Sequence, residues 1–430
     1  MQMMRSLNGY PLSWYAASAD IPPPYGSLDA DATSDICIIG GGYTGLSAAL
    51  HLAERGYSVL LAEKERVGFG ASGRNGGQVG SGQRLDQLTL EDRVGEYKAR
   101  QFWLLAEEAK DLVAHLIERH RISCCYKPGI VTAAWSEKEA KRAREYARHL
   151  EARYGYKKSQ PLDRKAISEF TGSGAFAGGF ADWGAGHLHP LKFAIGLAKA
   201  ASSAGARIHE STAIRSIVDQ AGSVLIRTGK HQIKCDKAIV ACNGYIEELN
   251  ETIKERVAPI NNFIIATEPL GAVGPSIMPS GTAAFDTRFV VCYFRKSHDG
   301  RMLFGGGENY RSTFPDDIAS LVRKPMAKVF PQLDRVAIDY AWGGKLAITM
   351  SRMPCFIRPS DNVISASGYS GHGVAMACLA GRILADSINA NSSQFNLFAN
   401  FKTPKFPGGP LFRSSLLALA LSWLAIRDRI

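Results

Sequence analysis

The stretch Asp35-Ile-Cys-Ile-Ile-Gly-Gly-Gly-Tyr-Thr-Gly45 decides the fold of this chain. An apolar run leads into a glycine cluster, and the cluster opens a segment with helical spacing that stops at Gly56. The next run, Tyr57-Ser-Val-Leu-Leu-Ala62, has the composition of a strand. Strand, tight turn, helix and strand in this order form a βαβ unit, the seed of a doubly wound parallel sheet. We therefore expect an α/β fold with a Rossmann-like domain.

The glycine cluster matches the Gly-x-Gly-x-x-Gly pattern of dinucleotide-binding turns. In that pattern one glycine makes the tight turn, one lets the backbone approach a pyrophosphate, and one lets the helix pack on the strand. The helix N-terminus then faces the phosphate charge. Glu63 ends the second strand about twenty residues further on, where a carboxylate can accept hydrogen bonds from ribose hydroxyls. The predicted cofactor contacts here are Gly40, Gly42, Tyr43, Thr44, Gly45, Glu63 and Lys64.

Two more glycine-rich segments have a composition suited to ligand binding. The loop 68–77 can lay backbone N–H groups along a ligand, although a flexible linker is the alternative interpretation. The segment 362–376 indicates a strand, a glycine turn and a helix, whose first amides would stabilise negative charge on a reduced flavin ring. His372 lies in this turn, and we favour backbone positioning over proton transfer for it. The predicted contacts are Ala71, Ser72, Gly73, Arg74, Asn75, Gly76, Gly77, Gly368, Gly371, His372, Gly373 and Val374.

The rest of the chain indicates a second domain. With 430 residues, 46% hydrophobic and 21% charged, the composition is globular and the length is typical of two domains. Short strand-like runs between 259 and 342 favour an α+β substrate domain on a mainly antiparallel sheet. These runs are Phe263–Thr267, Phe289–Phe294 and Arg301–Phe304. We expect a discontinuous FAD-binding domain from 1–90, 155–258 and 343–430, and a substrate domain from 91–154 and 259–342.

Charge and cysteine usage narrow the class of partner. The formal charge of +11 is spread along the chain, and the run Lys138–Glu145 mixes both signs as a solvated helix face does. No nucleic-acid motif accompanies the charge, so an anionic cofactor or substrate end explains it better. The eight cysteines lack metal-ligand spacing, and we expect buried reduced thiols and no metal.

The two ends of the chain bear on location. The N-terminal segment has no pattern of a secretory or transit signal, which favours a cytoplasmic protein. Near the C-terminus, the apolar run Leu416–Ile426 is about half the length that spans a bilayer. A helix docked on the protein is favoured there, and an interfacial membrane anchor is the alternative.

The combined motifs resemble the D-amino-acid oxidase and sarcosine oxidase superfamily of flavoproteins. Beside the three glycine-rich segments, the resemblance rests on Ala341-Trp-Gly-Gly344, Thr349, Pro354 and Pro407-Gly-Gly409. Within that superfamily, three segments resemble the branch that oxidises gamma-glutamylputrescine, namely Ser13–Ser18, Gly73–Gly77 and Leu424–Arg429. The resemblance implies bound FAD, hydride transfer from a C–H bond next to nitrogen, hydrolysis of the imine, and reoxidation by oxygen. Such chemistry requires no side-chain base, so no catalytic residue is assigned beyond His372 as a weak candidate.

Departures from the family patterns predict how flavin and substrate are held. Sarcosine-type oxidases place a lysine for the substrate carboxylate where this chain has Ala375, and a flavin-linking cysteine where it has Leu346. Another branch links flavin to a histidine where Ser72–Arg74 stands. We therefore expect non-covalent FAD and an amine whose carboxylate lies far from the reacting carbon. An Arg or Lys in 259–342 is expected to bind that carboxylate, and Arg295 and Lys296 are candidates for promoting the oxygen reaction.

The resulting hypothesis is an FAD-dependent amine oxidase acting on gamma-glutamylputrescine or a similar polyamine conjugate. Its products would be an aldehyde, ammonia and hydrogen peroxide. Three alternatives stay open: an N-methyl or D-amino-acid oxidase, a membrane-associated flavin dehydrogenase that passes electrons to a quinone, and a flavoprotein with a binding or structural role. Sequence alone leaves the oligomeric state open.

Overall fold

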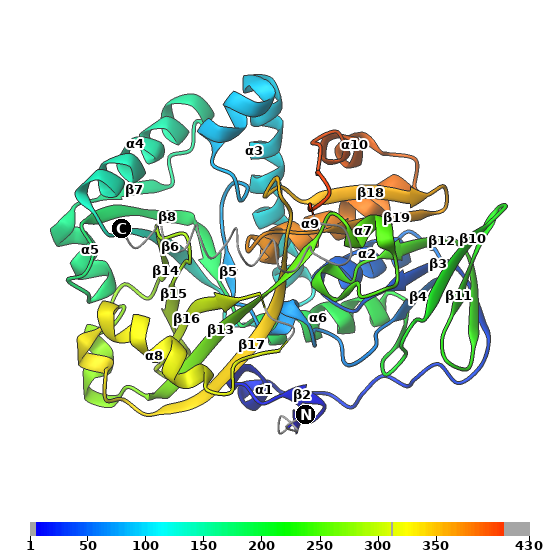
Figure 1. Ribbon diagram of the computed structural model, residues 1–430, viewed down its shortest axis with the longest axis horizontal. Helices are drawn as coiled ribbons and strands as arrows, with labels where there is room; N and C mark the ends of the chain where they lie inside the picture. Colours follow the sequence, from blue (N-terminus) through cyan, green and yellow to red (C-terminus); the bar gives the residue numbers. More distant parts are fainter. Residues whose placement is uncertain (1–5, 311–312, 408–430) are drawn as a thin grey trace.

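The computed structural model describes residues 6–310 and 313–407, which form two large sheets with helices around them (Figure 1). The eight-stranded sheet has the order β10-β11-β12-β3-β4-β9, with β19 beside β12 and β18 beside β19. Its strands are β3 (Ala32–Ile39), β4 (Val59–Ala62), β9 (Arg207–His209), β10 (Ser216–Gln220), β11 (Ser223–Arg227), β12 (Gln232–Val240), β18 (Cys355–Ser360) and β19 (Val363–Ser367). The central strands β12, β3, β4 and β9 are parallel, as the βαβ unit predicts.

The nine-stranded sheet is mainly antiparallel, and β14 pairs in parallel with β6. Its path runs β17-β13-β16-β15-β14-β6-β8-β5, with β7 beside β8. The strands are β5 (Gln78–Val79), β6 (Lys127–Ala134), β7 (Ser159–Leu162), β8 (Gly178–His187), β13 (Ala258–Pro269), β14 (Ala283–Asp286), β15 (Tyr293–Lys296), β16 (Arg301–Asn309) and β17 (Ile338–Ile348). A small hairpin of β1 (Ser6–Leu7) and β2 (Tyr10–Pro11) lies apart from both sheets.

The expected strand over Phe289–Phe294 is wrong in its first four residues. β15 begins at Tyr293, because the backbone N–H groups of Asp286 and Cys292 are engaged in a turn. The Asp286 N–H donates to the Cys292 carbonyl (2.9 Å), and the Cys292 N–H donates to the Asp286 carboxylate (2.9 Å). The side chain of Asp286 thus satisfies a backbone group that a sheet ladder would otherwise use.

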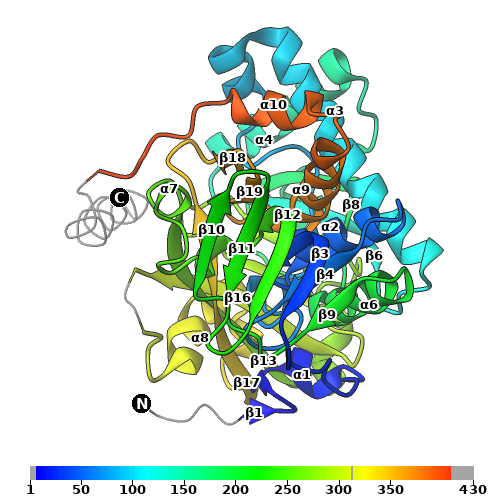
Figure 2. The same cartoon turned by 90° about the vertical axis from the view of Figure 1, so that its right-hand side faces the viewer.

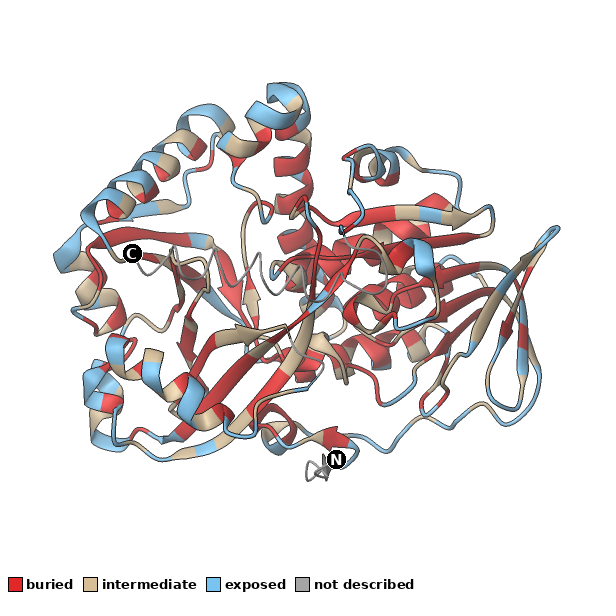
Figure 3. Cartoon of the chain, viewed as in Figure 1, coloured by how far each residue is buried: buried red, intermediate tan, exposed pale blue. Residues whose placement is uncertain are grey.

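Helices cover both sheets. They are α1 (Trp14–Ser18), α2 (Tyr43–Ala53), α3 (Gln87–Arg119), α4 (Glu137–Tyr154), α5 (Arg164–Thr171), α6 (Pro190–Ser203), α7 (Glu251–Lys254), α8 (Ile318–Val329), α9 (Gly373–Ile388) and α10 (Ser393–Ala399). Figure 2 shows α2, α6 and α9 beside the parallel strands, and Figure 3 shows that the strands are largely buried while much of α4 is exposed. The predicted C-terminal helix over Leu416–Ile426 lies outside the described residues.

The domain limits inferred from the sequence stay a prediction. Sheet pairing bears on one of them, because β7 and β8 lie in the nine-stranded sheet although 155–258 was assigned to the FAD-binding domain. Strand β5, which the limits 1–90 also place in the FAD-binding domain, pairs with β8 in the same nine-stranded sheet. We infer that the residues of β7 and β8 are better grouped with the substrate domain.

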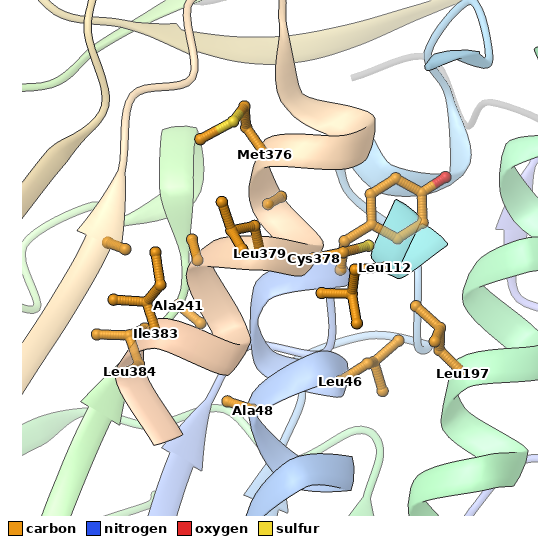
Figure 4. Packing of buried hydrophobic residues seen from close by; sticks show 14 of the residues in the cluster. Leu46, Ala48, Leu112, Leu197, Ala241, Met376, Cys378, Leu379, Ile383 and Leu384 are labelled. Carbon is orange, nitrogen blue, oxygen red and sulfur yellow. The ribbon is translucent and has the colours of Figure 1, made fainter. Parts of the chain in front are cut away.

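Helices α2 and α9 pack against each other with almost no space between them (Figure 4). A Cβ atom added at Gly381 would lie 2.4 Å from the Thr44 carbonyl oxygen and 2.7 Å from the Ala48 nitrogen. The buried Ser47 hydroxyl of α2 donates a second link between the helices, a hydrogen bond to the Cys378 carbonyl of α9 (2.7 Å). Both helices begin at glycine turns, so their close packing fixes the positions of two helix N-termini.

Candidate functional site

A cavity of about 1780 Å³ lies where the carboxyl ends of the parallel strands meet the second sheet. Ile39, Ala62 and Ala241, at or just beyond the ends of β3, β4 and β12, line it. Ligands of open α/β sheets bind at this edge, next to the strand where the chain order reverses. The N-termini of α2 and α9 also open onto the cavity, through Gly42 and Gly373.

Steric contact explains the glycines of the first turn. Gly40 has φ +108°, and a Cβ atom there would lie 2.8 Å from the Ala241 carbonyl oxygen. At Gly45 a Cβ atom would lie 1.9 Å from the Gly40 carbonyl oxygen, which no small shift can relieve. Gly42 has an ordinary φ of −86° and faces the Ser72 hydroxyl. These contacts form a turn whose backbone can approach a phosphate closely.

The carboxylate of Glu63 lies where the motif predicted it. It accepts hydrogen bonds from the backbone N–H groups of Gly41 (2.6 Å) and Glu65 (2.9 Å). Burial raises the pKa of Glu63, and these two hydrogen bonds oppose the rise. The adjacent Lys64 lines the cavity but pairs with Glu247 at 3.0 Å, and both side chains are exposed.

The early glycine loop is held in shape by its own polar groups. The Asn75 amide donates to the carbonyls of Ala71 and Ser72 (3.0 Å each) and accepts from the Gly77 N–H (2.7 Å). The Ser72 hydroxyl accepts from the Tyr43 N–H (3.0 Å), so the loop touches the first turn of α2. The flexible-linker interpretation of this loop is therefore unnecessary.

Arg74, a predicted cofactor contact, also has a structural role. Its buried guanidinium donates to the carbonyls of Phe69 (2.6 Å) and Gly343 (3.2 Å) and lies 4.4 Å from the centroid of the Phe69 ring. Burial lowers the pKa of Arg74. Although Arg74 lines the cavity, these donors fasten the loop to β17.

The second helix N-terminus follows the turn 368–373. Gly368 has φ +75° and Gly371 has φ +90°, values that favour glycine. His372 is the N-cap residue of α9, and its ring lies against Gly80, where a Cβ atom would come within 2.6 Å of it. Burial lowers the pKa of His372 to about 4, and the neighbouring Arg84 guanidinium acts in the same direction. His372 is therefore neutral at pH 7.

The structure brings the predicted cofactor residues together around one cavity. Those that line it are Gly40, Gly42, Tyr43, Thr44, Glu63, Lys64, Ala71, Ser72, Arg74, Asn75, Gly76, Gly371, His372, Gly373 and Val374. The other predicted residues shape the turns from behind, and a Cβ atom on any of them would strike a neighbouring atom: Gly45, Gly73, Gly77 and Gly368. The Tyr43 and Thr44 side chains tie the turns to the protein, bonding to the Pro190 carbonyl (3.0 Å) and the Tyr369 hydroxyl (2.6 Å).

Two cations that the sequence suggested lie outside this lining. Arg295 is buried and donates to the carbonyls of Gly76 (2.9 Å) and Leu188 (3.0 Å). Lys296 donates to the Gly274 carbonyl (3.0 Å) beside a separate small hollow. Both therefore serve local structure, and neither faces the large cavity.

Three charged residues that line the cavity were missed by the sequence reasoning. Arg84, Glu308 and Arg352 line the cavity from a loop, from β16 and from the turn after β17. Asn262 and Tyr293 line it nearby, and the Tyr293 hydroxyl donates to the Asn262 side chain (2.5 Å). No motif joins Arg84, Glu308 and Arg352, so only the fold could bring them together.

Among the described residues, no group of His, Cys, Asp or Glu side chains is suited to hold a metal ion. Over the same residues, no helix is both long and apolar enough to cross a membrane. Six cysteines are buried, whereas Cys125 is exposed and Cys242 is half-buried.

The donor set fits FAD. The N-terminus of α2 and the glycine turn 40–45 suit the diphosphate. The N-terminus of α9 suits the flavin, and the Glu63 carboxylate at the end of β4 suits a ribose. When bound, FAD would supply the acceptor for a hydride, that is, for two electrons and one proton. The residues that would hold it are the turn 40–45, Glu63, the loop 71–77 and the turn 368–374.

Comparison with known proteins supports this assignment. The FAD-dependent oxidoreductase family (DAO) matches residues 35–387. The chain is 42% identical to the probable oxidoreductase OrdL of Rhizobium meliloti (strain 1021), over 97% of each chain. It is 38% identical to gamma-glutamylputrescine oxidoreductase of Escherichia coli (strain K12), over 97% of this chain and 98% of that one.

Solved structures share the fold. Glycine oxidase from Geobacillus kaustophilus superimposes with a TM-score of 0.74 at 21% identity, covering 88% of this chain and all of that one. L-proline dehydrogenase from P. horikoshii gives 0.70 at 21% identity, over 85% and 96%. The fold, the turns and the family match agree, and this chain belongs to the DAO family of FAD-dependent oxidoreductases.

Proposed function

We propose that this enzyme oxidises the terminal C–N bond of gamma-glutamylputrescine or a closely similar polyamine conjugate. The likeness to the Escherichia coli gamma-glutamylputrescine oxidoreductase over nearly the whole chain carries this proposal. The products would be an aldehyde, ammonia and hydrogen peroxide. In this reaction the substrate carbon loses a hydride, which carries two electrons, and the nitrogen loses a proton, which gives an imine. Water adds to the imine and ammonia leaves, while oxygen takes up the two electrons with two protons to form hydrogen peroxide.

The residues around the cavity support a substrate with no charge near the reacting carbon. Ala375, at the position of the sarcosine-type lysine, is buried in the core beside α2 and contributes no charge to the cavity. Leu346 lines the cavity with an apolar side chain. The neutral His372 adds no positive charge at the flavin turn, so an approaching amine meets little repulsion from it.

Peroxide release with four amines tests the proposal. Purified enzyme loaded with FAD would be given gamma-glutamylputrescine, putrescine, sarcosine and D-alanine at pH about 8 to 9, where more of the amine is neutral. We expect gamma-glutamylputrescine to be the best substrate and free putrescine to be poor, because remote binding energy helps to hold the reacting carbon in place. Sarcosine or D-alanine as the best substrate would refute the assignment.

The same preparation tests two accompanying predictions. Flavin reduction by an amine without peroxide release would favour a dehydrogenase that passes electrons to a quinone. Acid or heat denaturation should release yellow FAD into the supernatant, because neither Ser72 nor Leu346 offers an atom for covalent attachment. Flavin that stays with the precipitate would contradict non-covalent binding. A cytoplasmic location stays a prediction.

A further inference from the structure

The substrate end of the cavity holds a group of three charged side chains, Arg84, Glu308 and Arg352, which we call the head-group cluster. Within 6–310 and 313–407, none of the three forms an ion pair, and neither guanidinium donates a hydrogen bond to the protein. The Glu308 carboxylate accepts a hydrogen bond from the Tyr310 hydroxyl. Arg84 is exposed, and Arg352 and Glu308 are half-buried. Unlike the Arg74 guanidinium, which donates to two carbonyls, the guanidiniums of Arg84 and Arg352 are therefore available to a ligand in the cavity.

The three charges act on one another. Partial desolvation by the cavity wall lowers the pKa of Arg84, the nearby Arg352 lowers it further, and Glu308 opposes both. Burial likewise lowers the pKa of Arg352, and Glu308 raises it. One carboxylate cannot neutralise two guanidiniums, so the cluster keeps an excess positive charge that an anionic ligand group would offset.

The backbone at Arg352 gives an independent observation. Arg352 has φ +64°, in the left-handed region where a side chain carries a steric cost that glycine avoids. The guanidinium lies 5.8 Å from the centroid of the Phe289 ring, and both residues line the cavity. A turn that would be more stable with glycine therefore presents an arginine to the cavity, which indicates a role for the side chain.

We propose that the head-group cluster binds the amino-acid end of a γ-glutamyl amine, and this inference rests on the proposed function. Arg84 and Arg352 bind the α-carboxylate, and Glu308 accepts hydrogen bonds from the α-ammonium group. Guanidinium is suited to this task because its planar donors match a carboxylate in pairs. The arrangement matches a zwitterion, with two cations for one anionic group and one anion for one cationic group. The proposal places the carboxylate-binding cations outside 259–342, the region in which the sequence analysis expected one.

Substrates that differ only at the amino-acid end test the cluster. N-acetylputrescine keeps the amide and the aminobutyl chain but has no charge at that end, and N-glutarylputrescine keeps the carboxylate without the α-amino group. The variants are Arg352→Gly, Arg84→Gln and Glu308→Gln, with exposed Arg93→Gln on α3 as the control outside the cavity. Arg352→Gly removes the guanidinium and gives the turn the residue that its φ favours, so its Tm should equal or exceed that of the wild type.

The ratios of kcat/KM give the expected result. In the two arginine variants, the preference for gamma-glutamylputrescine over N-acetylputrescine should fall by at least about tenfold, as loss of a charged hydrogen bond predicts. In Glu308→Gln, the preference over N-glutarylputrescine should fall by about tenfold. Arg93→Gln should keep both ratios. Unchanged ratios in the arginine variants, with gamma-glutamylputrescine still oxidised, would overturn the cluster and leave the proposed function intact.

A binding measurement tests the head-group cluster even if the proposed function is wrong. γ-Glutamyl-n-butylamine has the amino-acid end but lacks the terminal amine, and its binding would be titrated through the flavin absorbance of the holoenzyme. Binding that weakens at least about tenfold in Arg352→Gly and Arg84→Gln supports the cluster, even if the wild type oxidises none of the conjugates. Equal affinity in all variants, or loss of D-alanine oxidation in the arginine variants, would overturn it.

Discussion

The cofactor end of the cavity is lined mainly by backbone groups, whereas its proposed substrate end is lined by charged side chains. At the cofactor end, backbone groups and glycines define the surface, and the polar side chains there mostly bond to the protein itself, as Asn75 and Arg74 do. At the substrate end, Arg84 and Arg352 project charge without protein partners in the described chain. A surface made of backbone recognises a ligand common to a family, whereas free side-chain charge is specific to one substrate.

The largest expected effect tests the backbone surface. Gly42→Val should abolish FAD retention, because a side chain there meets the Ser72 hydroxyl and the space where the pyrophosphate would lie. The φ of −86° suits any residue, so the variant should still fold. Flavin content per protein, measured by absorbance after gel filtration, checks this. The exposed Gly26→Val, with no atom near its Cβ position, is the control. A folded Gly42→Val enzyme with full flavin would mean that the cofactor lies elsewhere.

A smaller effect on FAD binding is expected at Glu63, whose carboxylate holds the glycine turn and is predicted to contact the cofactor. Glu63→Gln keeps the shape but removes the charge that accepts from Gly41 and would accept from a ribose. FAD should bind about 10- to 100-fold more weakly, as expected for a charged hydrogen bond. Titration of apoprotein with FAD, followed by flavin fluorescence, gives the Kd. An unchanged Kd would place the ribose away from Glu63.

His372 lies at the flavin turn close to Arg84, and its protonation makes the stability of the fold depend on pH. Its pKa is about 4 in the fold and about 6.5 in an unfolded chain, so the unfolded state binds more protons between these values. His372 thus contributes stability above pH 6.5 that is lost as pH falls through 4, by up to about 3 kcal/mol. His372→Asn should show a smaller drop in Tm from pH 7 to 4.5 than the wild type. Parallel drops would mean that His372 is solvated.

The smallest effect is expected at the surface. Lys64 and Glu247 form an ion pair at 3.0 Å, but their side chains are 53% and 65% exposed. Such pairs contribute less than about 1 kcal/mol. Lys64→Ala should therefore change the Kd for FAD by no more than a few-fold, although its position next to Glu63 suggested a cofactor contact. A loss as large as that of Glu63→Gln would show that Lys64 contacts the nucleotide directly.

The glycine-rich turns around the cavity could be located from the sequence for a physical reason. Turns whose backbone requires glycine show glycines at fixed spacing in the sequence. Residues of the turn 40–45 and of the loop 71–77 line the cavity. The residues of the proposed substrate end form no motif in the sequence. Arg84 is one arginine among many, and the left-handed backbone of Arg352 cannot be read from the residue type. The strand predicted at Phe289 failed because a side chain of Asp286 captured the backbone N–H of Cys292.

The contact at Gly381 fixes the spacing between helices α2 and α9. Because backbone touches backbone there, α2 and α9 cannot slide or separate without a clash, and the distance between their two N-termini is fixed. A dinucleotide long enough to reach both ends gains from both, whereas flavin mononucleotide would engage only the end at α9. A cofactor bound at both N-termini would have to match this distance, which Gly381 sets from behind the cavity wall.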